Sequence, residues 1–470
     1  MHFVEYLKRP NMNIGFVEFF NFSLSYKKSN HLWDKKNFNF NSRIKNIRKK
    51  KNSIKLNLID KSENSSQKFL SWLSENNVYV SDQSTWGRPP HPGVISNNTI
   101  DEGESSGRGL IAFKNIQQNE KIIEIPENII ITEKNDFFNT PNYSLLNEYD
   151  KIAIFLIRER SKGDKSFWKP YLDALPFEND LKLVFRWKFS DLIFLQGSKI
   201  ILATKYQKKK IDIQFRYLRE KIFGPYPLIF PEEIFNLQSM EWAMTLLFSR
   251  AIYLQNSRKI AMVPYADLLN HNPYSTSYID SKSIPFSSSY EISMYSDRSY
   301  NKFDQIFTTY GPKTNLELLV LYGFSLERNP FEAYEIRVSL SKNDSKYFQK
   351  KNFIEECGKT SEITFPIFFY QYPKELYEFM SFCLITNTEI TDYEDYSFEN
   401  ENLNNFEINE TVKKTLSFIC KKNILKYPSI RNEDKIINSS IDNSYVSKNQ
   451  KISLRQRKIE KKILAKIIDN

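Results

Sequence analysis

The segment that most constrains this chain is Val263 to Asn272, Val-Pro-Tyr-Ala-Asp-Leu-Leu-Asn-His-Asn, read together with a second segment, Tyr310 to Phe324. In the first, an apolar strand-like run ends at a proline, and the short turn that follows carries Asp267, Asn270 and His271. The second segment contains two Tyr-Gly pairs whose tyrosines lie twelve residues apart. This combination of strand, turn and polar side chains predicts a functional site.

The length of 470 residues is enough for two or three domains, each with a sizeable core of its own. The longest purely apolar run covers only residues 152–157, far short of the ~18 residues that a membrane span needs. We therefore expect no membrane span, and any membrane contact would be peripheral.

The net charge of +11 is concentrated in the two ends of the sequence. Residues 1–64 carry +9 and residues 448–466 carry +7, whereas residues 65–447 carry −4 and Asp469 adds −1. A mildly acidic body is a poor surface for reading DNA. We expect the basic ends to be solvated tails, and contact with nucleic acid through them is an alternative that the charge allows but does not predict.

Cysteine and histidine are too few and too scattered for a structural metal site. The three cysteines lie at 357, 383 and 420, and the four histidines at 2, 31, 91 and 271. This spacing gives neither a disulfide framework nor a zinc-binding pair, so we expect no metal and a reducing compartment.

Composition changes divide the chain into three regions. Residues 1–64 form a basic, low-complexity leader, which is compatible with an organelle-targeting peptide and equally with a neutral Lys/Asn bias. A short amphipathic helix is expected from Ser65, and the glycine- and proline-rich stretch 86–109 is expected to be a loop. Residues 65–340 should form a first folded domain, and 341–470 a helical C-terminal domain with a basic tail.

Within the first domain, the pattern predicts a small, mostly antiparallel sheet interrupted by helices. Short strands are expected at 110–113, 122–125, 129–132, 260–263 and 305–309. A helical insertion is expected over about 140–257, with apolar stripes through Leu145 to Leu156 and Ile211 to Ile222. In the C-terminal domain, helices are expected at 374–385, 411–422 and 451–468. The last of these is expected to lie on its own domain, with docking on a partner or a nucleic acid as the alternative. The predicted fold class is therefore α+β.

Several common chemistries are disfavoured by the motifs. Gly107-Arg108-Gly109 lacks the spacing of a dinucleotide-binding loop, and no phosphate-binding loop is present. His271 has no neighbouring serine or cysteine nucleophile motif, which argues against triad hydrolysis. The remaining aromatic and amide-rich site suits a cationic, planar or amino substrate.

Five collinear segments resemble the SET-domain methyltransferases of the Rubisco large-subunit lysine methyltransferase type. They are Gly107 to Leu110, Phe167 to Pro176, Ser249-Arg250, Val263 to Asn272 and Tyr310 to Phe324. The resemblance covers about residues 68–340 and implies a SET-domain β-fold with a helical insertion, followed by a mainly helical substrate-binding domain. Within this family, residues 86–92 and 101–110 look most like the plastid-nucleoid branch, whose members accompany the plastid RNA polymerase.

The resemblance implies transfer of a methyl group from S-adenosylmethionine to a protein lysine. It assigns Tyr310 as the catalytic residue. The other implied roles are cofactor binding by Gly107, Arg108, Gly109, Arg250, Asn270 and His271, and substrate binding by Asp267, Tyr322 and Phe324.

Each of these residues also has a plainer interpretation. Tyr310 could be a packed tyrosine at a strand end, and Asn270 could only cap the turn. Arg250 could pair with a core carboxylate, while Tyr322 and Phe324 could simply be core.

Two further functions remain open from the sequence. The chain could be a weakly active or non-catalytic structural subunit of a plastid nucleoid or transcription complex, because a fold does not fix a function. It could also bind nucleic acid through its tails. The sequence departs from the family pattern before Tyr310, where 303–305 is Phe-Asp-Gln instead of Gly-Glu-Gln, and this difference bears on substrate choice more than on cofactor binding. The expected location is the plastid, with the cytoplasm or nucleus as alternatives.

Overall fold

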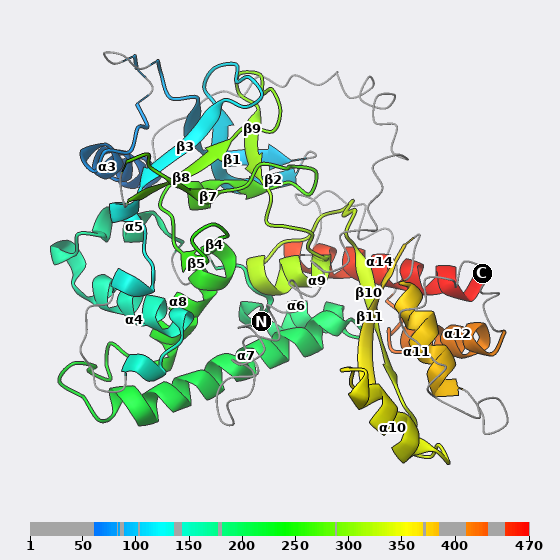
Figure 1. The fold of residues 1–470 in the computed structure, drawn as a ribbon. Helices are drawn as coiled ribbons and strands as arrows, with labels where there is room; N and C mark the ends of the chain where they lie inside the picture. Colours follow the sequence, from blue (N-terminus) through cyan, green and yellow to red (C-terminus); the bar gives the residue numbers. More distant parts are fainter. Residues whose placement is uncertain are drawn as a thin grey trace. The chain divides into compact units, whose positions relative to one another are not determined.

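The computed structural model describes residues 61–81, 83–84, 89–101, 104–135, 143–176, 181–286, 289–369, 373–384, 410–430 and 447–469. The chain forms two compact units, one from residues 1–179 and 210–312, the other from 180–209 and 313–470 (Figure 1). These units are defined by backbone contacts, and they divide at 312/313. The predicted border at residue 340, between the first folded domain and the C-terminal domain, stays a prediction. The leader 1–60 lies outside the described residues.

The first unit is built around a four-stranded sheet in the order β1-β2-β9-β6. Strands β1 (Gly93–Asp101) and β2 (Glu104–Ala112) form an antiparallel hairpin, so the prediction of a loop over 86–109 is wrong for its second half. Their pairing shifts register between Ser96 and Thr99, which accommodates a glycine-rich sequence in a strand. Main-chain pairing, not side-chain propensity, decides this structure.

Strands β9 (Gln305–Thr308) and β6 (Asn270–His271) pair in parallel, with Asn270 opposite Phe307 and His271 opposite Thr308. Strand β2 pairs with the other side of β9, with Leu110 opposite Ile306. This arrangement explains how segments far apart in sequence reach one edge of the sheet. The strand predicted at 305–309 is confirmed.

The same unit contains a three-stranded sheet, β3-β8-β7, and a short hairpin. The strands are β3 (Lys121–Pro126), β8 (Tyr290–Tyr295) and β7 (Asp280–Ser283), with β4 (Ile252–Leu254) and β5 (Lys259–Ala261) forming the hairpin. The strand predicted at 129–132 is wrong: a 3-10 turn, η3 (Glu127–Ile129), precedes a single bridge from Ile131 to Met262. Ile129, Ile130 and Ile131 are all buried, so this run lacks the alternation of a half-buried strand.

The first unit also contains helices, and they confirm the predicted apolar stripes except at Leu145, which lies before α4 in η5 (Tyr143–Leu145) and is 38% exposed. The helices are α3 (Lys61–Glu75), α4 (Glu148–Ser161), α5 (Lys169–Ala174), α8 (Leu237–Arg250) and the C-terminal part of α7 (Lys199–Leu218), whose residues 199–209 belong to the second unit. Asn147 and Asn236 cap α4 and α8 by accepting main-chain hydrogen bonds, which fixes where each helix begins. Helix α3 begins four residues before the predicted start, and α8 ends at Arg250, a predicted site residue.

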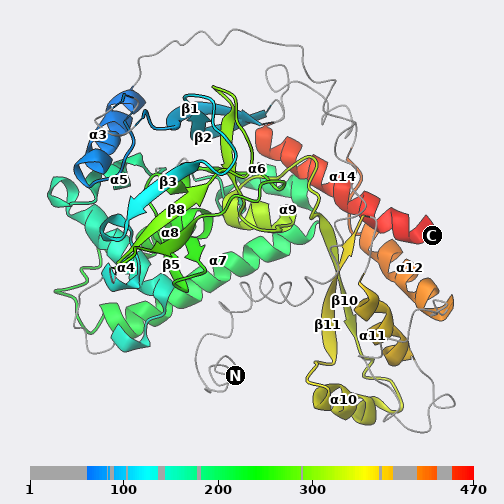
Figure 2. The ribbon, with the colours of Figure 1, turned by 45° about the horizontal axis from the view of Figure 1, so that its top comes forward.

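The second unit combines a two-stranded sheet with helices. Strands β10 (Ala333–Ser339) and β11 (Glu362–Phe368) are antiparallel, and Figure 2 shows helix α11 (Lys374–Leu384) beside them. The other helices of the unit's C-terminal part are α10 (Tyr347–Glu356), α12 (Glu410–Ile424) and α14 (Lys448–Asp469). The expectation of a mainly helical region after residue 340 did not include β11, whose Pro366 is tolerated because each strand of a two-stranded sheet is an edge.

Helix α14 confirms the expected helix over 451–468 that lies on its own domain, and it overturns the broader expectation that the basic end is a solvated tail. Its residues Ile463 and Leu464 are buried in the unit's apolar core. Arg457 is fully buried, and its guanidinium donates to the carbonyls of Phe194 and Pro428. Part of the +7 charge is therefore internal, which weakens the alternative of nucleic-acid binding through this end. In the described part of the chain, no helix is long and apolar enough to cross a membrane.

Candidate active site

The turn after β5 places the first group of site residues. Pro264 ends the apolar run, and a 3-10 turn, η11 (Ala266–Leu268), leads directly into β6. Tyr265 enters this turn with φ = 71° and ψ = −47°, a conformation that bulky side chains rarely adopt. Such local strain is typical of functional sites.

Tyr310 lies two residues after the end of β9, and its hydroxyl is held by the turn that precedes β6. Tyr310 Oη donates to the carbonyl oxygen of Leu269 at 2.7 Å. Burial raises the pKa of Tyr310 to about 12, with nearby Arg250 lowering it and Asp267 raising it by smaller amounts. The phenol is therefore protonated at neutral pH, so it serves as a hydrogen-bonding group and not as a base.

His271 supports Tyr310 through its ring. The main-chain N–H of Tyr310 donates to His271 Nδ1 at 3.1 Å, so Nδ1 is the unprotonated ring nitrogen. The two rings stack with centroids 5.0 Å apart and planes 19° apart. His271 thereby fixes both the backbone and the ring of Tyr310.

Asn270 joins β6 to the β1–β2 hairpin. Its Nδ2 lies 2.7 Å from Gln305 Oε1, 3.2 Å from Thr99 Oγ1 and 3.3 Å from the carbonyl oxygen of Arg108. Gly109 provides the room for this amide, because a Cβ there would come within 2.6 Å of Asn270 Nδ2. Gly107, in contrast, has φ = 80° and no atom near its missing Cβ, while its carbonyl oxygen accepts from Thr99 Oγ1 at 2.8 Å.

Asp267 is the centre of a buried charged cluster. Its Oδ2 accepts from Tyr171 Oη at 3.0 Å and pairs with Arg250 Nη1 at 3.5 Å. Arg250 Nη1 also donates to the main-chain oxygen of Asp267 at 2.9 Å. Burial raises the pKa of Asp267, and Arg250, Tyr171 and Arg108 partly offset that rise. The plainer interpretation of Arg250, a pair with a core carboxylate, is thus confirmed as a contact, without excluding a second role.

Arg108 adds a second cation to this cluster. Its guanidinium donates to the carbonyl of Ala174, and burial together with Arg250 lowers its pKa. Two guanidinium groups therefore face one carboxylate. Asp267 Oδ1 is buried and has no hydrogen-bond partner among the described residues, so the cluster is incomplete as it stands.

Tyr322 and Phe324 lie in the second unit. Tyr322 ends a π-helical turn, η12 (Leu318–Tyr322), which Gly323 closes with φ = 81°. The two rings contact edge to face with centroids 6.3 Å apart. Their assignment as walls of a lysine channel stays a prediction.

Two residues that support the site were not predicted as site residues. Tyr171 lies in the segment Phe167 to Pro176 that carries the resemblance, without an assigned role, but its hydroxyl binds Asp267. Gln305 accepts from Asn270 and donates to the carbonyl of Ile100 at 3.1 Å. The signal for Gln305 was available, because it is the residue of 303–305 that keeps the family's Gln.

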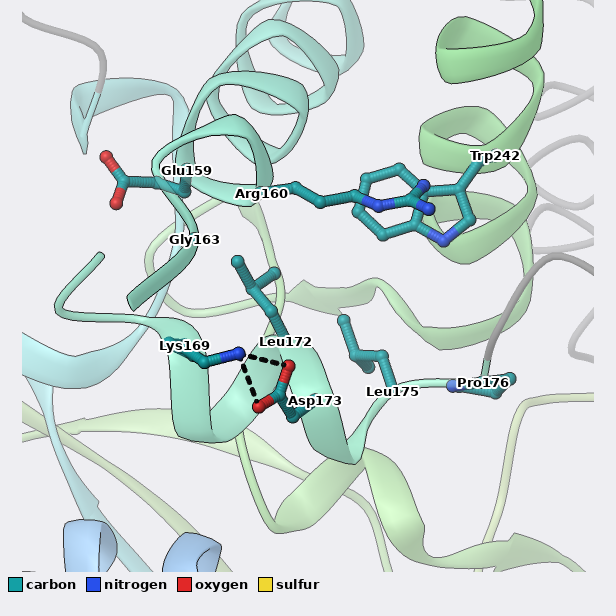
Figure 3. Close-up of a pocket in the computed structure, with 9 residues that line it drawn as sticks. All are labelled: Glu159, Arg160, Gly163, Lys169, Leu172, Asp173, Leu175, Pro176 and Trp242. Atoms are coloured by element: carbon teal, nitrogen blue, oxygen red, sulfur yellow. Dashed lines mark hydrogen bonds and ion pairs between the residues drawn. The ribbon is translucent and has the colours of Figure 1, made fainter. Parts of the chain in front are cut away.

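A separate pocket in the first unit contains none of the predicted site residues. Figure 3 shows Arg160 lying over the ring of Trp242, at 4.4 Å from the centroid, and Lys169 paired with Asp173. Both charged side chains have partners within the pocket wall. This pocket is therefore explained by packing between α4, α5 and α8.

Comparison with known proteins identifies related sequences and structures. Residues 107–311 match the family model "SET domain", and residues 341–464 match the model "Rubisco LSMT substrate-binding". The Pisum sativum protein "Ribulose-1,5 bisphosphate carboxylase/oxygenase large subunit N-methyltransferase, chloroplastic" is 29% identical over 311 residues, covering 64% of this chain and 60% of the relative. The Arabidopsis thaliana protein "[Fructose-bisphosphate aldolase]-lysine N-methyltransferase, chloroplastic" is 30% identical over 280 residues, covering 57% of each. The chain thus spans about 60% of the length of these curated relatives.

A solved structure extends the match to the fold. "Crystal structure of the SET domain of LSMT bound to Lysine and AdoHcy" aligns with a TM-score of 0.71 at 25% identity, covering 87% of this chain and 91% of that chain. The structural match and the two family models confirm the predicted α+β fold class, a SET fold followed by a substrate-binding region. The branch within the family is not shown by these matches.

Proposed function

Because this chain carries a SET domain followed by a Rubisco LSMT substrate-binding region, we propose that it is an S-adenosylmethionine-dependent protein-lysine N-methyltransferase. The observation that carries the proposal is the convergence of Tyr310, His271 and Asn270 at one sheet edge. The Tyr310 hydroxyl donates to the Leu269 carbonyl, and the Tyr310 main-chain N–H donates to His271 Nδ1. The neighbouring Asn270 amide donates to the Arg108 carbonyl in the hairpin. A structural relative, the SET domain of LSMT bound to lysine and AdoHcy, supports this proposal.

The residues present fit the proposed cofactor. The position of the missing Cβ of Gly107 is open, and Gly109 lets the Asn270 amide approach the hairpin at this point. The orphaned Asp267 Oδ1 and the excess of guanidinium groups offer partners for the charged ends of an amino acid. We assign the cofactor to the backbone of 107–109 with Arg108, Arg250, Asn270 and His271. When bound, S-adenosylmethionine supplies an electrophilic methyl group.

The chain's own residues prepare the lysine for attack. A lysine amine must be neutral to act as a nucleophile, yet its ordinary pKa is about 10.4. A buried site disfavours the ammonium, and the excess of cations over carboxylates around Asp267 adds to that effect. The Tyr310 hydroxyl donates its hydrogen bond to the Leu269 carbonyl oxygen. The lone pairs of the hydroxyl oxygen therefore remain to accept a hydrogen bond from the amine. Orientation of the amine then supplies much of the rate acceleration.

In this proposal, Asp267 contributes to the lysine pocket, while Tyr322 and Phe324 form the channel walls. The target is a lysine of a protein partner, which the region 341–464 would help to hold. The plastid is the proposed compartment, in keeping with the chloroplastic names of the relatives. Association with the plastid RNA polymerase or nucleoid rests on the resemblance of residues 86–92 and 101–110 alone.

The first test is calorimetric titration of the full chain with S-adenosylmethionine, comparing the unmodified protein with Asn270→Ala. Binding by the first and at least about tenfold weaker binding by the second are expected, because the alanine removes the amide that ties β6 to the hairpin. A labelled methyl group from the cofactor should then appear on lysine in a plastid protein extract, as located by mass spectrometry of the digested proteins.

The outcomes distinguish the proposed enzyme from its alternatives. A folded protein that binds no cofactor would contradict the proposal. Binding without transfer to any lysine would favour the structural subunit, and label on another residue type would correct the target. A fluorescent fusion of the full chain outside plastids would refute the proposed compartment.

A further inference from the structure

Tyr265 combines two properties that rarely occur together. Its backbone has φ = 71°, where a bulky residue is strained, and its side chain is only 1% exposed. Neither glycine nor asparagine, the residues that adopt this conformation readily, occupies the position. Surrounding contacts must therefore hold Tyr265 in place.

The contacts that hold Tyr265 come from the start of β1. Tyr265 Oη donates to the carbonyl oxygen of Gly93 at 3.0 Å and lies 3.4 Å from His91 Nδ1. His91 is itself buried, with Nδ1 close to the Gly93 main chain and Nε2 at 3.0 Å from the carbonyl oxygen of Ile122. The imidazole and phenol rings meet edge to face at 5.6 Å. Tyr265 is thus tied to both β1 and β3.

The turn that Tyr265 begins presents three functional groups. Leu268 N–H donates to the Tyr265 carbonyl at 3.2 Å, and Asp267 N–H donates to Val263 at 3.0 Å. The residues that follow present the Asp267 carboxylate to Arg250, the Leu269 carbonyl to Tyr310 and the Asn270 amide to the hairpin. A rotation at Tyr265 would move all three groups.

We propose that Tyr265 is a positioning residue, whose hydroxyl, held by Gly93 and His91, locks the strained turn that aims Asp267, Leu269 and Asn270. It does not contact Tyr310 in any described interaction, so it acts through the turn. Only its consequence for cofactor binding rests on the proposed function. The locking of the turn is a property of the protein alone.

Tyr265→Phe tests this role, because it keeps the buried ring and removes only the hydroxyl. Hydrogen–deuterium exchange of the full chain without ligand should become at least about tenfold faster in peptides covering 264–271, since the bonds of Asp267 and Leu268 open more often. Exchange in α4 should stay unchanged. The matched control is Tyr149→Phe, a buried tyrosine of α4, which should leave 264–271 as in the unmodified protein.

A second measurement connects the turn to the site. Calorimetry with S-adenosylmethionine should give about tenfold weaker binding for Tyr265→Phe than for Tyr149→Phe, by misplacement of Asn270. If Tyr265→Phe does not fold, His91→Gln takes its place and should also accelerate exchange in 264–271. The inference would be overturned if Tyr265→Phe folds and exchange in 264–271 is unchanged. If His91→Gln is used in its place, unchanged exchange in 264–271 would have the same meaning. If the unmodified protein binds no cofactor, the proposed function fails, yet the exchange result still decides the role of Tyr265.

Discussion

A Cβ added to Gly109 would lie 2.6 Å from Nδ2 of Asn270, closer than two such atoms can pack. The hairpin and β6 therefore meet here only because residue 109 has no side chain. Asn270 in turn fixes the hairpin through its bonds to Gln305 and to the Arg108 carbonyl. This contact joins the two motifs from which the cofactor site is inferred.

Gly109→Ala should weaken binding of S-adenosylmethionine by roughly tenfold or more, because the Asn270 amide must leave Gln305 to make room. Calorimetry measures this directly. Gly358→Ala is the control for a glycine substitution away from the site: at φ = 69° the alanine is strained, but its Cβ meets open space and no predicted site residue. Equal affinities for the two variants would show that the Gly109–Asn270 contact does not shape the site.

Asp267→Asn should destabilise the first unit by about 2–4 kcal/mol, because it leaves the buried Arg250 and Arg108 without their shared counter-charge. Urea unfolding followed by tryptophan fluorescence reports the loss. Glu362→Gln is the control, because it breaks an exposed ion pair with Arg337. The Glu362 side chain is 51% exposed and that of Arg337 67%, so stability should change by less than about 0.5 kcal/mol. A similarly small effect at Asp267 would mean that the cluster is not held by its charges.

Glu332 predicts a pH dependence in the second unit. Burial raises its pKa to about 8, well above the ordinary 4.5, although Gln456 and the Asn315 N–H donate to it. The folded protein thus keeps a proton that the unfolded chain loses, so the stability from this group declines as pH rises from 4.5 through 8. Between pH 6 and 9, the loss should be roughly 3 kcal/mol.

Glu332→Gln should flatten this dependence, because the amide mimics the protonated acid and cannot ionise. Gln456 Oε1, which has no partner among the described residues, is available to accept from the new amide. Thermal melting between pH 6 and 9 tests the change, with exposed Glu355→Gln as control. Glu460, also buried with a raised pKa, accounts for any remaining slope. A Glu332→Gln variant with the full original slope would refute the assignment.

The sequence predicted the elements that local pattern determines. The helix α4 was predicted correctly from its apolar periodicity, and strands β5 and β9 from short apolar runs bounded by turn residues. Both signals depend only on residues that are close in sequence. The strand β1 was missed because its glycines and polar residues acquire a strand conformation only by pairing with β2. Arg457 was misread as a tail cation because its carbonyl partners, on Phe194 and Pro428, lie far away in sequence.

The sequence predicted the motif residues of the site, but not the residues that hold them in place by hydrogen bonds. Asn270, His271 and Tyr310 stand out by resemblance, and the fold brings them to one sheet edge. Tyr171 and Tyr265 look like packing tyrosines in a sequence, because a hydroxyl that binds a distant carboxylate or carbonyl leaves no local signal. Long-range polar contacts therefore mark the limit of the sequence-based account.

The most direct test of the proposed function is the single-turnover rate of methyl transfer to lysine for Tyr310→Phe against the unmodified full chain, with cofactor affinity measured on both. For Tyr310→Phe we expect a rate at least about 100-fold lower, because the variant loses the oxygen that orients the amine. Cofactor affinity should stay within about threefold, because the Asn270 contacts remain. An unchanged transfer rate, in a variant that binds the cofactor normally, would contradict the proposed function.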